Sequence, residues 1–208
     1  MTERTAGVRA AKTIANRARM LSAAKELFID RGYAATTMKA IAERAGMAVQ
    51  TLYFTFANKR AILLELLDTE IAGDAEPIAT MDRPWFAEAV AAPPAEQIRL
   101  QVAAAARIHA RVAAMLEVVR SAAATDPELA EIWQTNLAQR LTVQQRLVTE
   151  LAAKTELREG ISVDRGADIA LALTAPETYR LLVGERGWSA QEWQEWVTGA
   201  LTDQLLGR

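Results

Sequence analysis

Few side chains in this sequence can carry out covalent or metal chemistry. The 208 residues include no cysteine and a single histidine, His109. The lack of cysteine excludes disulfides, thiolate nucleophiles and cysteine-bound metals, and one histidine does not suffice for a histidine-rich metal site. A Ser-His-Asp triad is not expected either. The sequence therefore predicts a protein without catalytic residues, metal or cofactor.

Hydrogen-bonding groups of another kind gather in residues 36–68, TTMKAIAERAGMAVQTLYFTFANKRAILLELLD. A helix-turn-helix needs a small residue where its helices cross, a turn residue that tolerates positive φ, and an apolar anchor on the inner side of the second helix. Ala42, Gly46 and Leu52 meet these three requirements. The segment is predicted to be a DNA-binding helix-turn-helix, and the alternative is a helical hairpin with no nucleic-acid role.

The outward side chains of this segment suit contacts with DNA, because hydroxyl and ammonium groups bind phosphates and amides read base edges. Gln50 either reads an adenine or stands solvated, and Thr51 contacts either a thymine methyl or a phosphate. Tyr53 is assigned to a phosphate rather than to the core, because Leu52 and Phe56 already supply the inner face. The predicted DNA-binding residues are Thr36, Thr37, Lys39, Val49, Gln50, Thr51, Tyr53, Thr55 and Lys59.

The charge distribution favours the same interpretation. Residues 1–60 hold 11 Lys and Arg against 4 Asp and Glu, a net charge of +7, although the whole chain carries −2. A local basic patch is typical of a nucleic-acid binder. Lys59 lies at the start of a helix, where an ammonium opposes the helix dipole, so a local stabilising role is disfavoured. The basic residues ahead of Arg19 form either an arm that reaches a groove or a solubilising segment.

An all-α fold is expected, because helix-forming residues dominate nearly every stretch and β-branched runs are absent. Thr36 or Thr37, Asn58 and Ser189 are predicted helix N-caps, and Ser189 forms a capping box with Glu192. Helices are predicted at residues 19–31, 38–45, 48–55, from 58 onward, 85–90, 95–124, 127–158, 164–186 and 190–206. Pro176 should kink or divide the helix at 164–186.

Composition bears on location. Hydrophobic residues make up 51% and charged residues 24% of the chain, which is typical of a globular protein. No apolar run approaches the ~18 residues that span a bilayer. The first 20 residues are basic but lack the apolar stretch of a secretory signal. We expect a cytoplasmic protein with no membrane association.

Residues 18–68 resemble the DNA-binding region of the tetracycline-repressor (TetR) family of bacterial regulators. Residues 165–206 are similar to the family's closing pair of helices, which commonly form a four-helix dimer interface. The chain departs from the family pattern at Ala48, Thr55 and Ala57. Because Ala48 stands where many members have Ser or Thr, the third helix lacks a hydroxyl cap. The first match is carried by AAKELFIDRGYAATT and by Thr36-Thr37, Ile41-Ala42, Ala45-Gly46, Thr51-Leu52-Tyr53, Phe56 and Asn58-Lys59-Arg60-Ala61.

This resemblance implies two domains. Residues 1–60 would be a three-helix DNA-binding domain with a basic N-terminal arm, and residues 61–208 a helical effector-binding and dimerisation domain. It implies a homodimeric repressor on a pseudo-palindromic double-stranded operator, released by a small effector. Two rivals remain: an α-helical enzyme or carrier whose basic segment is incidental, and a DNA-binding regulator that acts through a protein partner without a ligand.

The two long helices at 95–124 and 127–158 offer a candidate effector pocket. A largely apolar cavity for a hydrophobic or amphipathic effector is expected there. Burial with a hydrogen-bond partner is the first interpretation of His109, and core packing is the first interpretation of Met115 and Trp133, with a place in the pocket second. The predicted pocket residues are His109, Met115, Trp133 and Leu137.

The last helix carries an apolar face too large to leave in water. The sequence predicts that this face is a dimer interface, and packing inside the subunit is the alternative. The residues assigned to the interface are Trp193, Trp196, Val197, Leu201 and Leu205.

Overall fold

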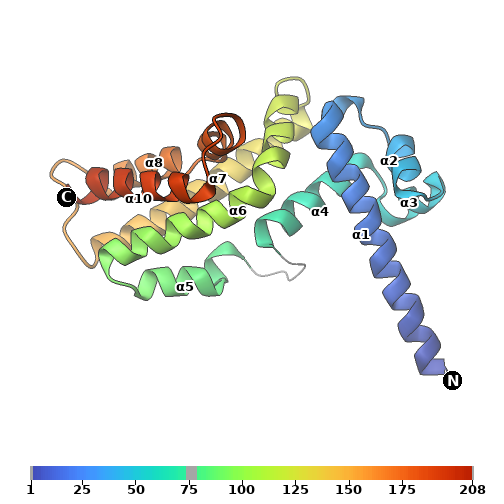
Figure 1. The fold of residues 1–208 in the computed structure, drawn as a ribbon, viewed down its shortest axis with the longest axis horizontal. Coiled ribbons are helices and arrows are strands. Elements are labelled where there is room, and N and C mark those ends of the chain that lie inside the picture. The colour runs from blue at the N-terminus through green and yellow to red at the C-terminus, as the bar shows by residue number, and fades with distance from the viewer. Residues whose placement is uncertain (1, 74–78, 208) are drawn as a thin grey trace. The chain divides into compact units, whose positions relative to one another are not determined.

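The computed structural model describes residues 2–73 and 79–207, with side chains from residue 11 onward. The chain divides into two compact units, Met1–Thr69 and Glu70–Arg208. Throughout the described ranges the regular elements are helices, which confirms the all-α prediction (Figure 1). Within the same ranges, no helix combines the length and the apolar character needed to cross a bilayer.

The first unit begins with a helix that starts at Thr2, well before the predicted start at Arg19. Its early residues include Ala, Arg and Lys, which favour helix. Gly32 interrupts the helical geometry with φ +77°, at the predicted stop. The side chains of Arg4 and Arg9, part of the predicted basic arm, lie outside the described residues. The helices of this unit are α1 (Thr2–Ala35), α2 (Met38–Ala45), α3 (Val49–Phe56) and α4 (Lys59–Ala72), whose last turn belongs to the second unit.

Local capping sets the bounds of these short helices, as predicted. The Thr37 hydroxyl accepts a hydrogen bond from the Ala40 N–H at 3.1 Å, and Asn58 Oδ1 accepts one from the Ala61 N–H at 2.8 Å. No side chain caps α3, because Ala48 occupies its N-cap position.

The boundary between the units falls between residues 69 and 70, whereas the sequence placed it after residue 60. The reason is that α4 is one uninterrupted helix. Its buried residues, from Ile62 to Leu67, lie in the part assigned to the first unit.

The second unit is built around two long helices. α8 and α10 lie along one side of the α6–α7 pair, and α5 lies along the other (Figure 1). α7 ends six residues earlier than predicted. The predicted helix at 164–186 is divided at Pro176, as expected. The elements are η1 (Thr80–Asp82), α5 (Pro84–Ala91), α6 (Pro94–Ala123), α7 (Pro127–Ala152), α8 (Val163–Leu173), α9 (Pro176–Tyr179), the π-helical η2 (Arg180–Glu185) and α10 (Ala190–Leu206).

The predicted capping box starts α10. Ser189 Oγ accepts a hydrogen bond from the Glu192 N–H at 3.1 Å, and the Ser189 N–H donates to the Glu192 carboxylate at 2.7 Å.

The apolar face of α10 is buried inside its own chain, so the predicted dimer interface is wrong at four of its five residues. Trp193, Val197, Leu201 and Leu205 are 0% exposed, in a core shared with residues of α6, α7 and α8. Helical periodicity shows that a helix has an apolar face, but it does not show which partner covers that face. The fifth residue, Trp196, is 40% exposed and remains available to a partner.

Candidate nucleic-acid interface and ligand pocket

The helix-turn-helix forms as its three predicted positions require. Ala42 is 1% exposed and Leu52 is 0% exposed. Gly46 ends α2 in the left-handed region with φ +66°. A Cβ at this position would lie 3.1 Å from Nη2 of Arg19, which donates to the Ala45 carbonyl at 2.7 Å. Glycine therefore satisfies both the backbone conformation and the close approach of Arg19.

A clamp of three side chains joins α1, α3 and α4. The Arg17 guanidinium forms a double hydrogen bond with the Glu65 carboxylate and lies 4.5 Å from the centre of the Phe56 ring.

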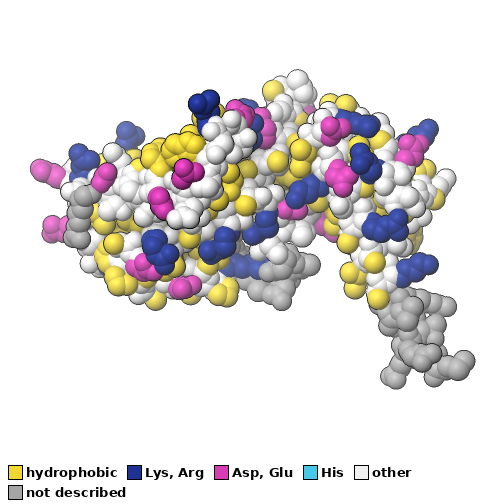
Figure 2. Space-filling view, in the orientation of Figure 1, with side chains coloured by type: hydrophobic (Ala, Val, Ile, Leu, Met, Phe, Trp, Pro, Cys, Tyr) yellow, Lys and Arg dark blue, Asp and Glu magenta, His cyan; other side chains and the backbone are white. Residues whose placement is uncertain are grey.

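Arg44 pairs with Glu26 at 3.0 Å. Part of the basic excess of this unit, visible as dark blue side chains in Figure 2, therefore holds the fold together. The number of charges directed at DNA is accordingly smaller than +7.

The predicted DNA-contacting residues differ in exposure. Val49, Thr55 and Lys59 are half-buried, and Thr36 is buried. The Thr55 hydroxyl donates to the Thr51 carbonyl of its own helix at 2.8 Å. The exposed members of the set are Thr37, Lys39, Gln50, Thr51 and Tyr53.

The predicted DNA contact of Thr36 is corrected by its burial. Thr36 is 1% exposed, and its hydroxyl lies 2.8 Å from the Gly32 carbonyl and 3.1 Å from the Leu27 carbonyl. The side chain satisfies carbonyls at the end of α1, where helical hydrogen bonding stops. It cannot reach a phosphate from this position.

Lys59 has a structural role, although the sequence disfavoured one because an ammonium at a helix start opposes the helix dipole. Its ammonium donates to the Tyr33 carbonyl at 2.6 Å and to the Thr36 carbonyl at 2.9 Å, and it lies 4.0 Å from the centre of the Tyr33 ring. Lys59 thereby fastens the start of α4 to the segment between α1 and α2. These partners lie 23 and 26 residues away in the chain, so no local pattern could reveal them.

Phe54 is a surface residue that sequence reasoning missed. Its side chain is 94% exposed on α3, and Tyr53 beside it is 52% exposed. Phe54 lies on the helix that is predicted to read bases, and its apolar ring suits contact with a thymine methyl group.

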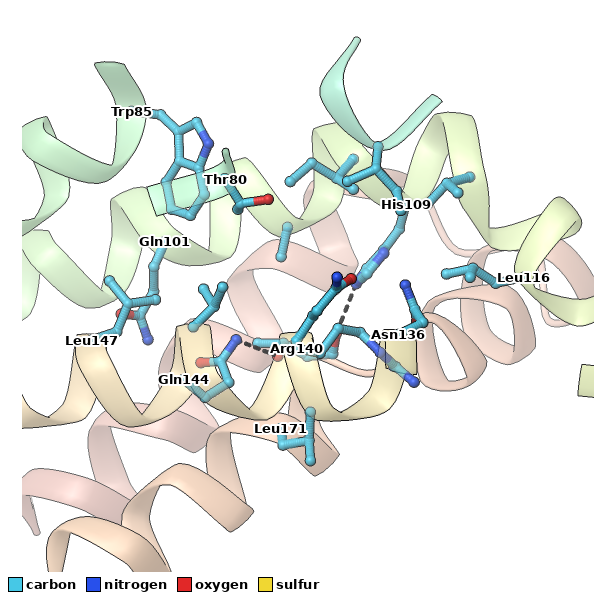
Figure 3. Close-up of a pocket in the computed structure, with 17 residues that line it drawn as sticks. Thr80, Trp85, Gln101, His109, Leu116, Asn136, Arg140, Gln144, Leu147 and Leu171 are labelled. Atoms are coloured by element: carbon cyan, nitrogen blue, oxygen red, sulfur yellow. Dashed lines mark hydrogen bonds between the residues drawn. The ribbon is translucent and has the colours of Figure 1, made fainter. Parts of the chain in front are cut away.

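The second unit contains a cavity of about 120 Å³ (Figure 3). Its wall is formed by the end of α4, η1, α5, α6, α7 and α8, together with Thr174 just after α8. The lining residues are mainly apolar, and the polar ones gather where α6 and α7 face each other. The polar members are Thr80, Gln101, His109, Asn136, Gln139, Arg140, Gln144 and Thr174.

One of the four predicted pocket residues, His109, lines this cavity. Met115 is 0% exposed in the core, and neither Met115 nor Leu137 is among the described residues that line it. Trp133 lies 5.2 Å from the Arg140 guanidinium and lines a separate cavity of about 10 Å³. The prediction is wrong at these three residues because helical spacing shows which residues share a face of a helix, but not which face borders the cavity.

Sequence reasoning missed the polar side of the pocket. Asn136, Arg140 and Gln144 follow one another at intervals of four, which places them on one face of α7. A polar stripe at helical spacing was the available signal. It was overlooked because such stripes are usually solvated.

The chemistry of His109 is fixed by one hydrogen bond. Nε2 lies 2.7 Å from the Thr174 carbonyl, which only accepts, so Nε2 carries the proton and Nδ1 is an acceptor. Burial lowers the pKa of His109 to about 4, although the hydrogen bond with the Thr174 carbonyl by itself raises this pKa. The imidazole is therefore neutral at pH 7.

This pKa predicts a pH-dependent stability. Between pH 6.5 and about 4 the unfolded chain binds a proton on His109 that the folded chain does not, so the folded state loses stability as pH falls. We expect the free energy of unfolding to drop by about 2 kcal/mol between about pH 7 and about pH 5 from this residue alone. Urea unfolding of the wild type and of His109→Gln measures it, because the chain has no other histidine. An equal drop in both proteins would contradict the prediction.

The fold and the helix-turn-helix define a DNA-binding regulator of transcription. Residues 20–66 match the model of the family described as bacterial regulatory proteins, tetR family, so this part of the chain is similar to the DNA-binding region of that family. The match covers the later part of α1, all of α2 and α3, and the first part of α4, within the segment 18–68 that carries the sequence resemblance.

Relatives extend the similarity to the second unit. The uncharacterised HTH-type transcriptional regulator YdeS of Bacillus subtilis (strain 168) is 29% identical over 167 residues, which are 79% of this chain and 77% of YdeS. The structure of the regulator FadR from Bacillus subtilis, in complex with stearoyl-CoA, is 21% identical, with a TM-score of 0.68 and coverage of 88% and 96%. A regulator from Saccharomonospora viridis in complex with choline is 19% identical, with a TM-score of 0.66 and coverage of 91% and 96%. These two structures share the fold.

Proposed function

We propose that this chain is a homodimeric repressor that binds a pseudo-palindromic operator and is released by a small amphipathic effector. The observation that carries the proposal is a complete helix-turn-helix whose Thr37, Gln50 and Thr51 are exposed. A protein that binds an operator must be in the same compartment as the DNA, so a cytoplasmic location is part of the proposal. No catalytic activity is proposed.

In this proposal α3 enters the major groove and reads base edges. Gln50 suits an adenine, Thr51 a thymine methyl or a phosphate, and Phe54 a thymine methyl. Thr37, Lys39 and Tyr53 are assigned to phosphates, because their polar groups flank the reading helix and suit backbone oxygens.

Gln50→Ala and Phe54→Ala are expected to relax base preference, each at one position of every half-site, by about 1–3 kcal/mol. The lost contacts are sequence-specific, so affinity for scrambled DNA should change little. Binding of fluorescent operator variants, with every base substituted at each position, measures the effect. Lys39→Ala is the comparison, because loss of a phosphate contact should weaken binding to all sequences alike. Unchanged base preference in both alanine variants would count against α3 as the reading helix.

A second copy of the chain is the partner proposed for the exposed apolar residues of α10 and η2. Trp196 is 40% exposed, Leu181 is 48% exposed, and the Trp188 and Trp196 rings meet edge to face with centroids 6.0 Å apart. One helix-turn-helix reads one half-site, so a symmetric dimer is needed to read a pseudo-palindrome.

The proposed release uses the end of α4. Ile71, in the last turn of α4, lines the cavity, and Arg111 of α6 donates to the Glu70 carbonyl at 2.9 Å and to the Ile71 carbonyl at 3.3 Å. A ligand in the cavity can therefore displace the end of a helix that begins in the helix-turn-helix unit. Shifting the population from 99:1 to 1:99 requires a preference of about 5.5 kcal/mol for the released state.

The two similar structures that hold ligands do not indicate one ligand class. The FadR structure holds stearoyl-CoA and the Saccharomonospora viridis structure holds choline, two molecules with little chemistry in common. The largely apolar lining with one polar side supports an amphipathic effector.

Selection of bound fragments from a genomic DNA pool tests the proposal. Recovery of a pseudo-palindromic sequence upstream of genes, bound by a dimer and released by a compound that raises the melting temperature of the protein, is the expected result. Failure to enrich any sequence would favour the rival enzyme or carrier. A sequence that is bound but released by no stabilising compound would favour a regulator that acts through a protein partner.

A further inference from the structure

We propose that the cavity binds a small organic acid, whose anionic group pairs with Arg140 and whose hydroxyl or N–H donates to Nδ1 of His109. This inference rests on the proposed function of the cavity as the effector site. It goes further by naming the ligand's charge and its hydrogen-bonding groups.

The charge of the cavity lining favours an anionic ligand. Among the described residues that line the cavity, Arg140 is the single charged one at neutral pH. Its side chain is 18% exposed, and its Nε has no hydrogen-bond partner within the described part of the chain. Its ion pair with Glu177 is loose, since Nη1 and Oε2 lie 3.6 Å apart. A partly buried guanidinium whose carboxylate partner is this loose is costly, and an anionic ligand would offset that cost.

The electrostatics of Arg140 agree with this assignment. Burial lowers the pKa of Arg140, and the nearby Glu177 carboxylate raises it. An arginine nevertheless keeps its proton in proteins, so the cavity retains a positive charge. The same charge disfavours a cationic ligand.

Buried acceptors in the lining favour a ligand that carries a hydrogen-bond donor. Nδ1 of His109 and Oε1 of Gln144 are buried and have no hydrogen-bond partner among the described residues. Nδ1 can only accept, because Nε2 already donates to the Thr174 carbonyl. His109 is 7% exposed, so bulk water does not solvate this nitrogen freely.

The orientation of the Gln144 amide follows from its partner. The Thr174 hydroxyl donates to the Ala170 carbonyl at 2.7 Å, so it can only accept from the Gln144 amide nitrogen, at 3.3 Å. Oε1 of Gln144 is therefore left as a second acceptor in the lining. In Figure 3 the His109 and Gln144 side chains come from facing helices. His109 is hydrogen-bonded to the carbonyl of Thr174, and Gln144 to its hydroxyl. A ligand that leaves these acceptors unmatched would bury them without a hydrogen bond, which is unfavourable.

The remaining wall sets the size of the ligand's apolar part. A cavity of about 120 Å³ is of the order of the ~150 Å³ that accommodates benzene, so one ring or a short chain fits without displacement of the walls. The apolar lining residues are Ile71, Trp85, Ala105, Ile108, Val112, Leu116, Val143, Leu147 and Leu171.

Calorimetric titration of the full chain with two matched series tests the inference. The ring series is 4-hydroxybenzoate, 4-hydroxybenzamide and benzoate, and the chain series is 6-hydroxyhexanoate, 6-hydroxyhexanamide and hexanoate. In at least one series the hydroxy acid is expected to bind at least about tenfold tighter than its amide, and tighter than the acid without the hydroxyl. Choline serves as the cationic probe and should give no measurable binding.

Substitutions in the cavity test which side chains cause the preference for the acid over the amide and the advantage of the hydroxyl. Arg140→Met should remove the tenfold preference for acid over amide, and Arg140→Lys should retain part of it. Arg146→Met is the matched control, because Arg146 lies on the same helix but is exposed and pairs with Glu150 at 2.7 Å. His109→Phe should remove the advantage of the hydroxyl while leaving the acid preference in place. Circular dichroism establishes that each variant is folded.

Three outcomes would overturn the inference: amides that bind as tightly as their acids, an Arg140→Met protein that keeps the preference, or no binding in either series at millimolar concentration. Because the titrations contain no DNA, they are independent of the proposed regulatory role. An acid that binds but does not release the protein from its operator would contradict the proposed release and leave this inference standing.

Discussion

Raising the salt concentration from about 50 to about 200 mM is expected to weaken operator binding about a thousandfold. The reason is counterion release, which lowers affinity by about 0.9 log units per log unit of salt for each phosphate neutralised. Arg17 and Arg44 have close carboxylate partners, whereas Lys12 and Arg19 are exposed, and Lys39 is 81% exposed with Glu43 no nearer than 3.9 Å. If each of these three cations in each protomer neutralises one phosphate, a dimer neutralises about six. The predicted slope of log affinity against log salt concentration is then about −5.

Fluorescence anisotropy over a salt series measures this slope. Lys39→Ala should make it shallower by about two units, one for each half-site. Arg107→Ala is the control, because Arg107 is an exposed cation of similar length on α6 and should leave the slope unchanged. An operator complex that is insensitive to salt would rule out the proposed phosphate contacts.

Trp193→Ala is expected to lower the free energy of unfolding by about 3–5 kcal/mol, because it removes a large side chain from a packed core. Trp193 is 0% exposed, and its ring centroid lies 5.1 Å from that of Tyr179 and 6.0 Å from that of His109. Trp196→Ala, the same change three residues later on the same helix, should cost the isolated chain far less because Trp196 is 40% exposed.

Oligomeric state separates the two tryptophans further. Trp196→Asp should leave the chain folded but shift it from dimer to monomer, because it places a charge in the proposed interface. Urea unfolding and light scattering on the same samples measure both effects. If Trp193→Ala were fully stable and monomeric, Trp193 would belong to an interface between chains after all.

Features that depend on residues close together in the chain could be predicted from the sequence. The caps at Thr37 and Asn58, the capping box at Ser189, and the interruptions at Gly32 and Pro176 follow from hydrogen bonds and backbone restrictions within a few residues. The helix-turn-helix belongs to the same group, since its small, turn and anchor residues lie within a span of 11 positions.

Other assignments required the tertiary structure, because they depend on contacts between distant parts of the chain. Helical spacing showed that α10 has an apolar face, but only the packing of α6 to α8 shows that this face is internal. Lys59 suited a phosphate by type, yet its ammonium is held by carbonyls more than 20 residues away. Arg140 and Gln144 line a cavity only because α7 faces α6 across it, and Thr174 is hydrogen-bonded to both Gln144 and His109. Periodicity assigns a residue to a face, whereas burial and hydrogen-bond partners depend on what the fold brings against it.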